Sequence, residues 1–209
     1  MAIKPHAAAL SRAANTEPIT IGVLALQGDY DAHARAFERA GVRTILVRKA
    51  EELAGIDGLA MPGGESTTML KFLDKHGFFE ALKKFVSNTP TFATCAGVIL
   101  LAREVLNPKQ RSLGALDATV ERNAYGRQID STILTAPTEL PGGPLEMVFI
   151  RSPRITRVGQ GVEVLARRDG APTLVRQAHL LAATFHPEMT SDTRVQQLFL
   201  DMVRAHKGR

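Results

Sequence analysis

Short apolar runs alternate with segments of helical periodicity through the first half of the chain. The apolar runs predict buried strands, which lie at 19–26, 44–48, 58–61 and 91–94. The helical patterns between and after them predict helices at 30–40, 67–74, 78–86 and 98–105, with a short one at 51–53. This alternation predicts an α/β domain with an open, mostly parallel sheet flanked by helices.

The second half of the chain has a different pattern, with many strands and few helices. Strands are predicted at 118–122, 131–135, 146–150, 162–168, 173–177 and 179–184. Because few helices separate them, part of the sheet should be antiparallel or mixed. A closing helix is predicted at 191–206. Residues 1–18 show neither pattern, so we expect a poorly ordered extension before one domain at 19–209.

Composition narrows the classes of protein that fit. The chain has 209 residues, of which 44% are hydrophobic and 22% charged, which suits one globular domain. No apolar stretch approaches the roughly 18 residues of a membrane-spanning helix, so no membrane association is expected. The net charge is +5, but Lys and Arg are scattered, Trp is absent and aromatic residues make up 5%. This does not favour nucleic-acid binding, and a basic surface facing an acidic partner protein explains the charge equally well.

The only cysteine, Cys95, stands where a predicted strand meets a predicted helix. It excludes an intrachain disulfide and points to a reducing compartment, here the cytoplasm, or to a chemical role. The segment 91–102 places small residues, Ala96 and Gly97, directly after the cysteine. That is the layout of a nucleophile elbow, in which a tight strand-to-helix turn presents the nucleophile above the sheet. The alternative is a small buried core residue.

A second motif, His186-Pro187-Glu188, follows an apolar strand. A thiol nucleophile needs a base that takes its proton and later protonates the leaving group, and imidazole does both near neutral pH. A carboxylate two residues further on can hold the imidazole ring, because strand residues two apart point the same way. The alternative is a loop histidine beside a solvated glutamate.

A third motif, at 61–68, contains Gly63 and Gly64 directly after a strand. Glycines there let the backbone approach a ligand, and their N–H groups can face a developing oxyanion. The alternative is a plain turn with a Ser or Thr cap for the next helix, which does not exclude a role in the site. A phosphate-binding loop is disfavoured, since the P-loop pattern and its lysine are absent.

With these motifs in place, the chain resembles the class I (triad-type) glutamine amidotransferases. Within them it is similar to the glutaminase subunits of two-component pyridoxal 5′-phosphate synthases. The resemblance rests on segments 22–28, 62–68, 94–97, 120–128, 149–153 and 185–190. It implies a flavodoxin-like three-layer fold. It also implies hydrolysis of L-glutamine through a cysteine thioester, with ammonia passed to the synthase subunit.

The resemblance also implies roles for individual residues. In it, Cys95 is the nucleophile, His186 the general base and acid, and Glu188 the residue that orients His186. The backbone N–H groups of Gly64 and Ala96 form the oxyanion hole. The residues that contact glutamine are Gly64, Glu65, Ser66, Arg122, Ile150 and Arg151. Gln27 matches a position linked to activation by the partner, and Arg127 is expected to be structural.

Partners and cofactors follow from the same resemblance. The glutaminase is nearly idle until the synthase subunit docks, and the synthase, not this chain, binds the phosphate substrates and the cofactor product. No cofactor is implied, and no metal, because His186 and Glu188 lack further ligands at metal spacing. Ser152 and Tyr125 depart mildly from the family pattern, where Ala and Phe are usual. The alternatives are a glutaminase of another class I amidotransferase and a partner-binding subunit without activity, although the second would be expected to lack a triad residue.

Overall fold

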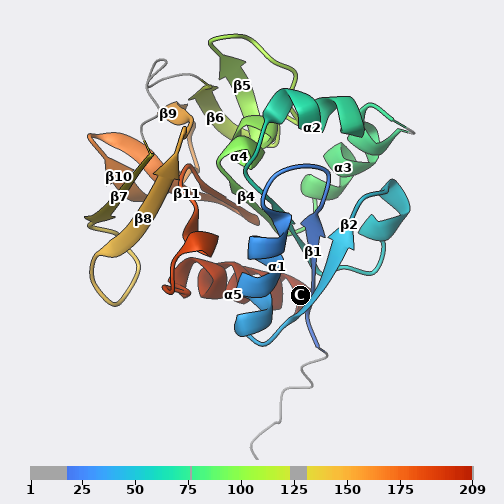
Figure 1. Ribbon diagram of the computed structural model, residues 1–209, viewed down its shortest axis with the longest axis horizontal. Coiled ribbons are helices and arrows are strands. Elements are labelled where there is room, and N and C mark those ends of the chain that lie inside the picture. The colour runs from blue at the N-terminus through green and yellow to red at the C-terminus, as the bar shows by residue number, and fades with distance from the viewer. Residues whose placement is uncertain (1–17, 76, 123–130, 209) are drawn as a thin grey trace, which may run out of the picture.

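The computed structural model describes residues 18–75, 77–122 and 131–208, and its centre is a seven-stranded sheet (Figure 1). Its strands are β1 (Thr20–Leu24), β2 (Arg43–Val47), β3 (Gly58–Met61), β4 (Thr91–Thr94), β10 (Glu163–Arg168), β11 (Ala171–Gln177) and β12 (Leu180–Ala183). Their spatial order is β10-β11-β12-β4-β3-β1-β2. The strands from β12 to β2 run parallel, whereas β10 and β11 are antiparallel to their neighbours. The predicted mixed, mostly parallel sheet is therefore confirmed.

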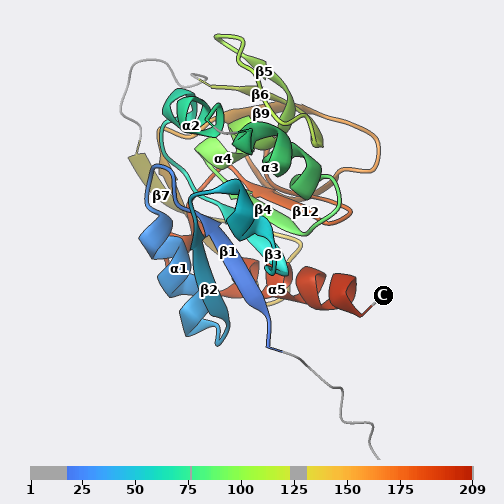
Figure 2. The ribbon, with the colours of Figure 1, turned by 90° about the vertical axis from the view of Figure 1, so that its right-hand side faces the viewer.

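Helices cover both faces of this sheet, which gives three layers. One face carries α1 (Tyr30–Arg39) and α5 (Arg194–Lys207), and the other carries α2 (Ser66–Leu73), α3 (Phe78–Val86) and α4 (Ala96–Leu101) (Figure 2). Two short 3-10 helices, η1 (Ala50–Leu53) and η2 (Pro187–Met189), complete the helical elements of the described chain. The central strands are buried on both faces, as continuous apolar runs of parallel strands require.

Alternating side chains of each strand supply two separate cores. In β3, Leu59 and Met61 pack with α2 and α3, whereas Ala60 faces the α1 and α5 side. On that second side, the ring of Phe199 lies 5.8 Å from that of Phe37 and 5.7 Å from that of Phe92. Full burial of one such side chain stabilises the fold by about 1.5–3 kcal/mol. These contacts hold the helices, and the loops that precede them, against the sheet.

Smaller strands lie beside the main sheet. A three-stranded sheet contains β5 (Ala102–Leu106), β6 (Leu116–Glu121) and β9 (Arg154–Val158), and a hairpin pairs β7 (Ser131–Ala136) with β8 (Leu145–Ile150). A bridge between Thr138 and Ala166 connects the segment after β7 to β10. The hairpin thus lies next to the antiparallel end of the main sheet (Figure 1).

Some predicted elements are wrong. The helix predicted at 98–105 ends at Leu101, and β5 begins at Ala102 with an extended backbone, φ −60° and ψ 150°. The reason is burial: α4 is buried on every side, so the charged side chains of Arg103 and Glu104 could not continue it. The sequence reasoning missed β9, and it began the last helix at 191, whereas α5 begins at Arg194.

Two sequence-based expectations fall largely outside the described residues. The predicted extension at 1–18 is described only at Pro18. The motif at 120–128 is described only as far as Arg122, so Tyr125 and Arg127 also lie outside. In the part of the chain that is described, no helix has the length and apolar character needed to cross a membrane.

Candidate active site

Four neighbouring strands end beside one another, and each is followed by a predicted functional segment. In the spatial order β12, β4, β3 and β1, these segments carry His186, Cys95, Gly64 and Gln27. Because the four strands are parallel, their carboxyl ends share one edge of the sheet, where ligands of open α/β sheets bind. A pocket of about 410 Å³ lies at this edge and is lined by all four segments.

Cys95 occupies the tight turn between β4 and α4. Its backbone has φ 46° and ψ −109°, a conformation that non-glycine residues adopt rarely and that costs of order 1–3 kcal/mol. Its N–H donates to the carbonyl of Ala183 over 2.9 Å, which ties the turn to β12. A side chain at Gly97 would collide with the carbonyl of Met61, so only glycine lets the start of α4 pack this closely on β3.

His186 and Glu188 meet through a short turn. The ring Nδ1 of His186 lies 2.7 Å from Oε1 of Glu188, and both residues are buried. The backbone N–H of His186 donates to the carbonyl of Val148 over 2.8 Å, which fixes the residue beside β8. The prediction that strand geometry aligns the pair is wrong: His186 precedes the 3-10 helix η2, which contains Glu188 and begins with Pro187. The turn folds the carboxylate back onto the ring.

The pKa values of this pair move in opposite directions. Burial lowers the pKa of His186, but hydrogen bonds to Cys95 and Glu188, together with their negative charge, outweigh it and raise the pKa to about 10. Burial raises the pKa of Glu188, but the charge of His33 and hydrogen bonds from both histidines lower it to about 2. Since Nδ1 of His186 faces Glu188, Nε2 is the ring nitrogen left for the thiol. At neutral pH the geometry therefore favours an imidazolium between a carboxylate and a sulfur.

The loop after β3 packs against both reactive side chains. A Cβ atom placed on Gly63 would lie 2.5 Å from Cε1 of His186 and 3.1 Å from Cβ of Cys95. Gly64 has φ +143°, which side chains rarely tolerate, and a Cβ atom there would meet the side-chain oxygen of Gln27. That oxygen accepts a hydrogen bond from the N–H of Glu65. The Gln27 side chain thus holds the loop that carries the predicted oxyanion donor.

Glu65 links the pocket to the start of α2. Its carboxylate accepts hydrogen bonds from the backbone N–H groups of Thr67 and Thr68, over 3.2 and 2.7 Å, so Glu65 itself caps the helix. The Ser or Thr cap offered as the alternative interpretation of this motif is therefore wrong. Its Oε1 also lies 3.5 Å from a guanidinium nitrogen of Arg122. Burial raises the pKa of Glu65, but hydrogen bonds from the two threonines lower it to about 2, which keeps it anionic beside Arg122.

Arg122 lines the pocket and has spare hydrogen-bonding capacity. Its side chain is 14% exposed, and its buried Nε has no hydrogen-bond partner among the described residues. Ser66, also buried, instead donates to the side-chain oxygen of Gln110 over 3.0 Å. A cationic donor without a partner at a pocket wall suits a ligand carboxylate.

The structure brings the predicted site residues together. Those lining the pocket are Gln27, Gly64, Glu65, Ser66, Cys95, Ala96, Arg122, Ile150, Arg151 and His186. Glu188 lies behind His186, outside the lining. The pocket is also lined by Gly63 of the predicted glycine motif, and by residues that were not predicted: Asp29, Ile99, Pro153 and Met189.

Sequence reasoning also missed a second buried histidine near the site. His33 in α1 lies 3.2 Å from Glu188, four residues before Phe37 on the buried face of the helix. A polar residue on an otherwise apolar stripe was the available signal.

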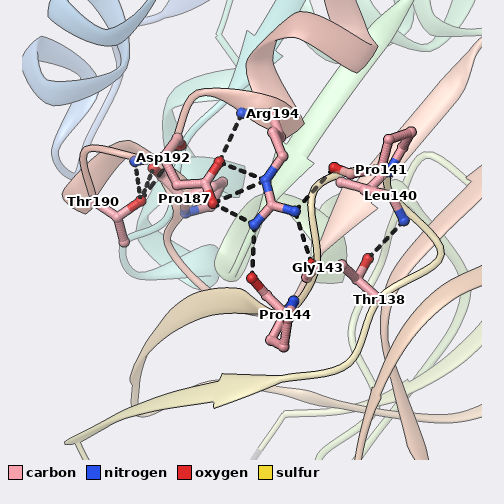
Figure 3. A network of polar contacts seen from close by, with 9 residues as sticks. All are labelled: Thr138, Leu140, Pro141, Gly143, Pro144, Pro187, Thr190, Asp192 and Arg194. Carbon is pink, nitrogen blue, oxygen red and sulfur yellow. Dashed lines mark hydrogen bonds and ion pairs between the residues drawn. The ribbon is translucent and has the colours of Figure 1, made fainter.

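A polar network around Arg194 holds the segment that follows Glu188 (Figure 3). The guanidinium donates to the carbonyls of Pro141, Gly143 and Pro144, over 3.0, 2.8 and 2.7 Å. It also forms an ion pair with Asp192 at 2.7 Å, which lowers the pKa of that carboxyl through hydrogen bonding. The network therefore clamps the β7–β8 loop to the start of α5.

The described residues contain no group of three or more His, Cys, Asp or Glu side chains placed to hold a metal ion. The chemistry that this pocket can perform with its own residues is nucleophilic attack by sulfur with proton transfer through imidazole. A buried carboxylate orients the imidazole ring, as in the hydrolytic triads that recur on unrelated folds.

Comparison with known proteins gives consistent matches over nearly the whole described chain. Residues 23–205 match the model of the SNO glutamine amidotransferase family. The chain is 63% identical over 184 residues to pyridoxal 5′-phosphate synthase subunit PdxT of Koribacter versatilis, covering 88% of this chain and 95% of that protein. The identity is 51% over 191 residues to the PdxT subunit of Solibacter usitatus, covering 86% and 97%. A solved structure described as a glutamine amidotransferase superposes with a TM-score of 0.81 at 46% identity, covering 88% of this chain and 98% of that one.

Proposed function

The chain belongs to the SNO glutamine amidotransferase family, and from this membership we propose that it is the glutaminase subunit of a pyridoxal 5′-phosphate synthase. In this role it hydrolyses L-glutamine to L-glutamate and ammonia for vitamin B6 synthesis. The relatives at 63% and 51% identity carry the subunit's name and are matched over almost their full length.

One observation supports the chemistry most directly: a thiol and an imidazole from distant parts of the chain line one pocket, with a carboxylate directly behind the imidazole. Cys95 follows β4, and His186 and Glu188 follow β12, the neighbouring parallel strand. The 2.7 Å contact between His186 and Glu188 orients the imidazole ring, and the Cys95 side chain lies near enough to that ring to help raise its pKa. We therefore assign Cys95 as nucleophile, His186 as general base and acid, and Glu188 as the orienting carboxylate.

In the first half of the reaction, the proton of the Cys95 thiol is held on His186, as the imidazolium that the raised pKa favours, and the sulfur attacks the side-chain amide carbon of glutamine. The amide oxygen becomes an oxyanion, for which the backbone N–H groups of Gly64 and Ala96 are the proposed donors. The carbon–nitrogen bond then breaks as His186 gives its proton to the leaving nitrogen. Ammonia departs and a glutamyl thioester remains on Cys95.

In the second half, water attacks the thioester carbon while His186 takes one of its protons. The carbon–sulfur bond breaks, glutamate leaves, and the proton returns to the sulfur. The protonated form of His186 is the acid that the leaving groups need, and its raised pKa of about 10 keeps that form available at neutral pH. Glu188, with its pKa lowered to about 2, stays anionic throughout and stabilises the imidazolium.

Binding of the substrate's α-amino-acid end is assigned to Arg122 and its neighbours in the pocket lining. Arg122 supplies a buried, unpartnered donor for the carboxylate, and Glu65 holds the guanidinium in place. Glu65, Ser66, Ile150 and Arg151 line the same space and complete the proposed glutamine site. Arg151 has φ 47°, a strained backbone of the kind found at functional sites.

The partner in this proposal is the synthase subunit, which receives the ammonia and activates the glutaminase on docking. Gln27 is the residue we assign to that activation, because its side chain contacts the backbone of the oxyanion loop. A cysteine that must remain a thiol fits a reducing compartment, and we propose the cytoplasm.

The test is glutamine hydrolysis by the purified chain, alone and with its cognate synthase subunit. We expect glutamate release to rise sharply when the synthase is added. Cys95→Ala should abolish the release while leaving circular dichroism and thermal unfolding unchanged, because the side chain is small and carries the chemistry rather than the core. A well-folded wild-type chain that stays inactive with a docked partner would refute the assignment.

A further inference from the structure

His33 is a buried histidine that the reaction above does not use. It lies in α1, is 1% exposed, and has a neighbouring aromatic ring, Phe92, at 6.1 Å in edge-on geometry. The pocket lining does not include it. Burying a polar ring on the apolar face of a helix is costly unless its nitrogens find partners. Nδ1 has no hydrogen-bond partner among the described residues, so the contacts of Nε2 indicate the role of His33.

The Nε2 atom of His33 faces two side chains of the catalytic region. It lies 2.9 Å from Oγ1 of Thr94, the residue before Cys95, and 3.2 Å from Oε1 of Glu188. The pKa of Glu188 is lowered to about 2, so its carboxylate is ionised and can only accept. The hydrogen must therefore lie on Nε2 of His33, where it faces both the hydroxyl of Thr94 and the carboxylate of Glu188.

A single carboxylate oxygen thus faces both histidines. Oε1 of Glu188 lies 2.7 Å from Nδ1 of His186 and 3.2 Å from Nε2 of His33. The other oxygen, Oε2, is buried and has no hydrogen-bond partner among the described residues. Without His33, no other described side chain would hold Oε1 toward His186, and the carboxylate could rotate about its terminal bond.

We propose that His33 is a positioning residue for the triad: it holds Glu188 from the α1 side and so keeps the ring of His186 aligned with Cys95. The chain of contacts runs from the thiol through His186 and Glu188 to His33, and it joins β4, η2 and α1. This inference rests on the proposed glutaminase function. In metal sites, removing a group that orients a directly acting ligand commonly costs about 10–100-fold in affinity or activity, and we expect an effect of this kind here.

The test uses substitutions that separate the two ring nitrogens. In His33→Gln the amide nitrogen falls near the position of Nε2, whereas in His33→Asn it falls near Nδ1 and cannot reach Glu188. His33→Leu removes both nitrogens. Each variant is assayed as the full chain with saturating synthase subunit, and kcat and KM for glutamine are measured separately. Wild-type activity under these conditions tests the underlying function, independently of His33.

We expect His33→Asn and His33→Leu to lower kcat about tenfold, the equivalent of one lost orienting hydrogen bond, with KM unchanged. His33→Gln should keep kcat within about threefold of wild type, since it restores the donor. A purely structural histidine would instead give losses that follow thermal stability and do not distinguish Gln from Asn. If the wild-type chain is active and the His33→Gln and His33→Asn variants have equal kcat values, the proposal is overturned.

Thr94→Val addresses the second contact of His33. It removes the hydroxyl at 2.9 Å but leaves Glu188 in place. We expect kcat to stay within about threefold of wild type. A loss equal to that of His33→Asn would mean that His33 acts through Thr94, and it would overturn the role assigned through Glu188.

Discussion

Gly63→Ala is the smallest change that should disturb the triad without removing any of its members. The added methyl carbon would lie 2.5 Å from Cε1 of His186, whereas ordinary contact begins near 3.4 Å. Either the ring or the loop must therefore move by about 0.9 Å. The residue has no positive φ, so the substitution acts by contact rather than by backbone strain.

Neither the ring of His186 nor the loop that contains Gly63 can move freely. The ring of His186 is buried, and moving it stretches its 2.7 Å contact with Glu188. The loop is backed by Gly28, whose Cα lies against the carbonyl of Gly63 so closely that a side chain there would overlap it. A misplacement of about 1 Å can cost about 10²-fold in rate, or about 2.7 kcal/mol of transition-state stabilisation. We expect a loss of this size in kcat.

The assay is steady-state glutamine hydrolysis with saturating synthase subunit, together with thermal unfolding and a measurement of complex formation. Gly208→Ala is the matched control, because a Cβ atom there makes an ordinary contact, 3.5 Å from the carbonyl of Arg204, and φ is −83°. The control should keep wild-type kcat. If Gly63→Ala also keeps wild-type kcat while folding and docking normally, the close packing of this loop on His186 is not what positions the base.

Three further predictions concern substrate binding, pH and stability. Arg122→Lys should raise KM for glutamine by roughly 10- to 100-fold with a smaller effect on kcat, because lysine cannot make the two-pronged contact of a guanidinium with a carboxylate. An unchanged KM would show that Arg122 does not bind the substrate. A histidine with its pKa raised from 6.5 to about 10 stabilises the fold fully below pH 6.5 and loses that contribution as pH rises toward 10. Denaturant unfolding should therefore show stability falling more steeply over this range in wild type than in His186→Gln, and parallel profiles would contradict the pKa assignment. Arg194→Lys keeps the charge but loses the guanidinium that donates to three carbonyls, so calorimetry should show Tm lowered by roughly 2–5 °C. An unchanged Tm would show that this network does not contribute to the stability of the fold.

Local sequence pattern determined much of the architecture. The buried runs at β1, β3, β4 and β12 are short and mostly apolar, which is typical of parallel strands buried on both faces. The elbow at Cys95 was likewise readable, because the small residues after it are needed for the close approach of α4 to β3.

Long-range packing decided what local pattern could not. The apolar run that begins at Val98 continues through Ala102, so only the surrounding burial shows that the helix stops at Leu101. The alignment of His186 with Glu188 depends on the turn η2, which is held by a hydrogen bond to β8 rather than by strand periodicity.

By itself, the sequence determined which chemical groups this protein carries and that each follows a strand, since residue type and periodicity are properties of neighbouring positions. The tertiary structure alone decided which strands are adjacent, and so placed His33 of α1 against Glu188, a residue 155 positions later in the chain. Contacts across such separations are selected by how whole faces of helices and sheets bury against one another. That selection depends on the packing of the complete chain, and no short segment encodes it.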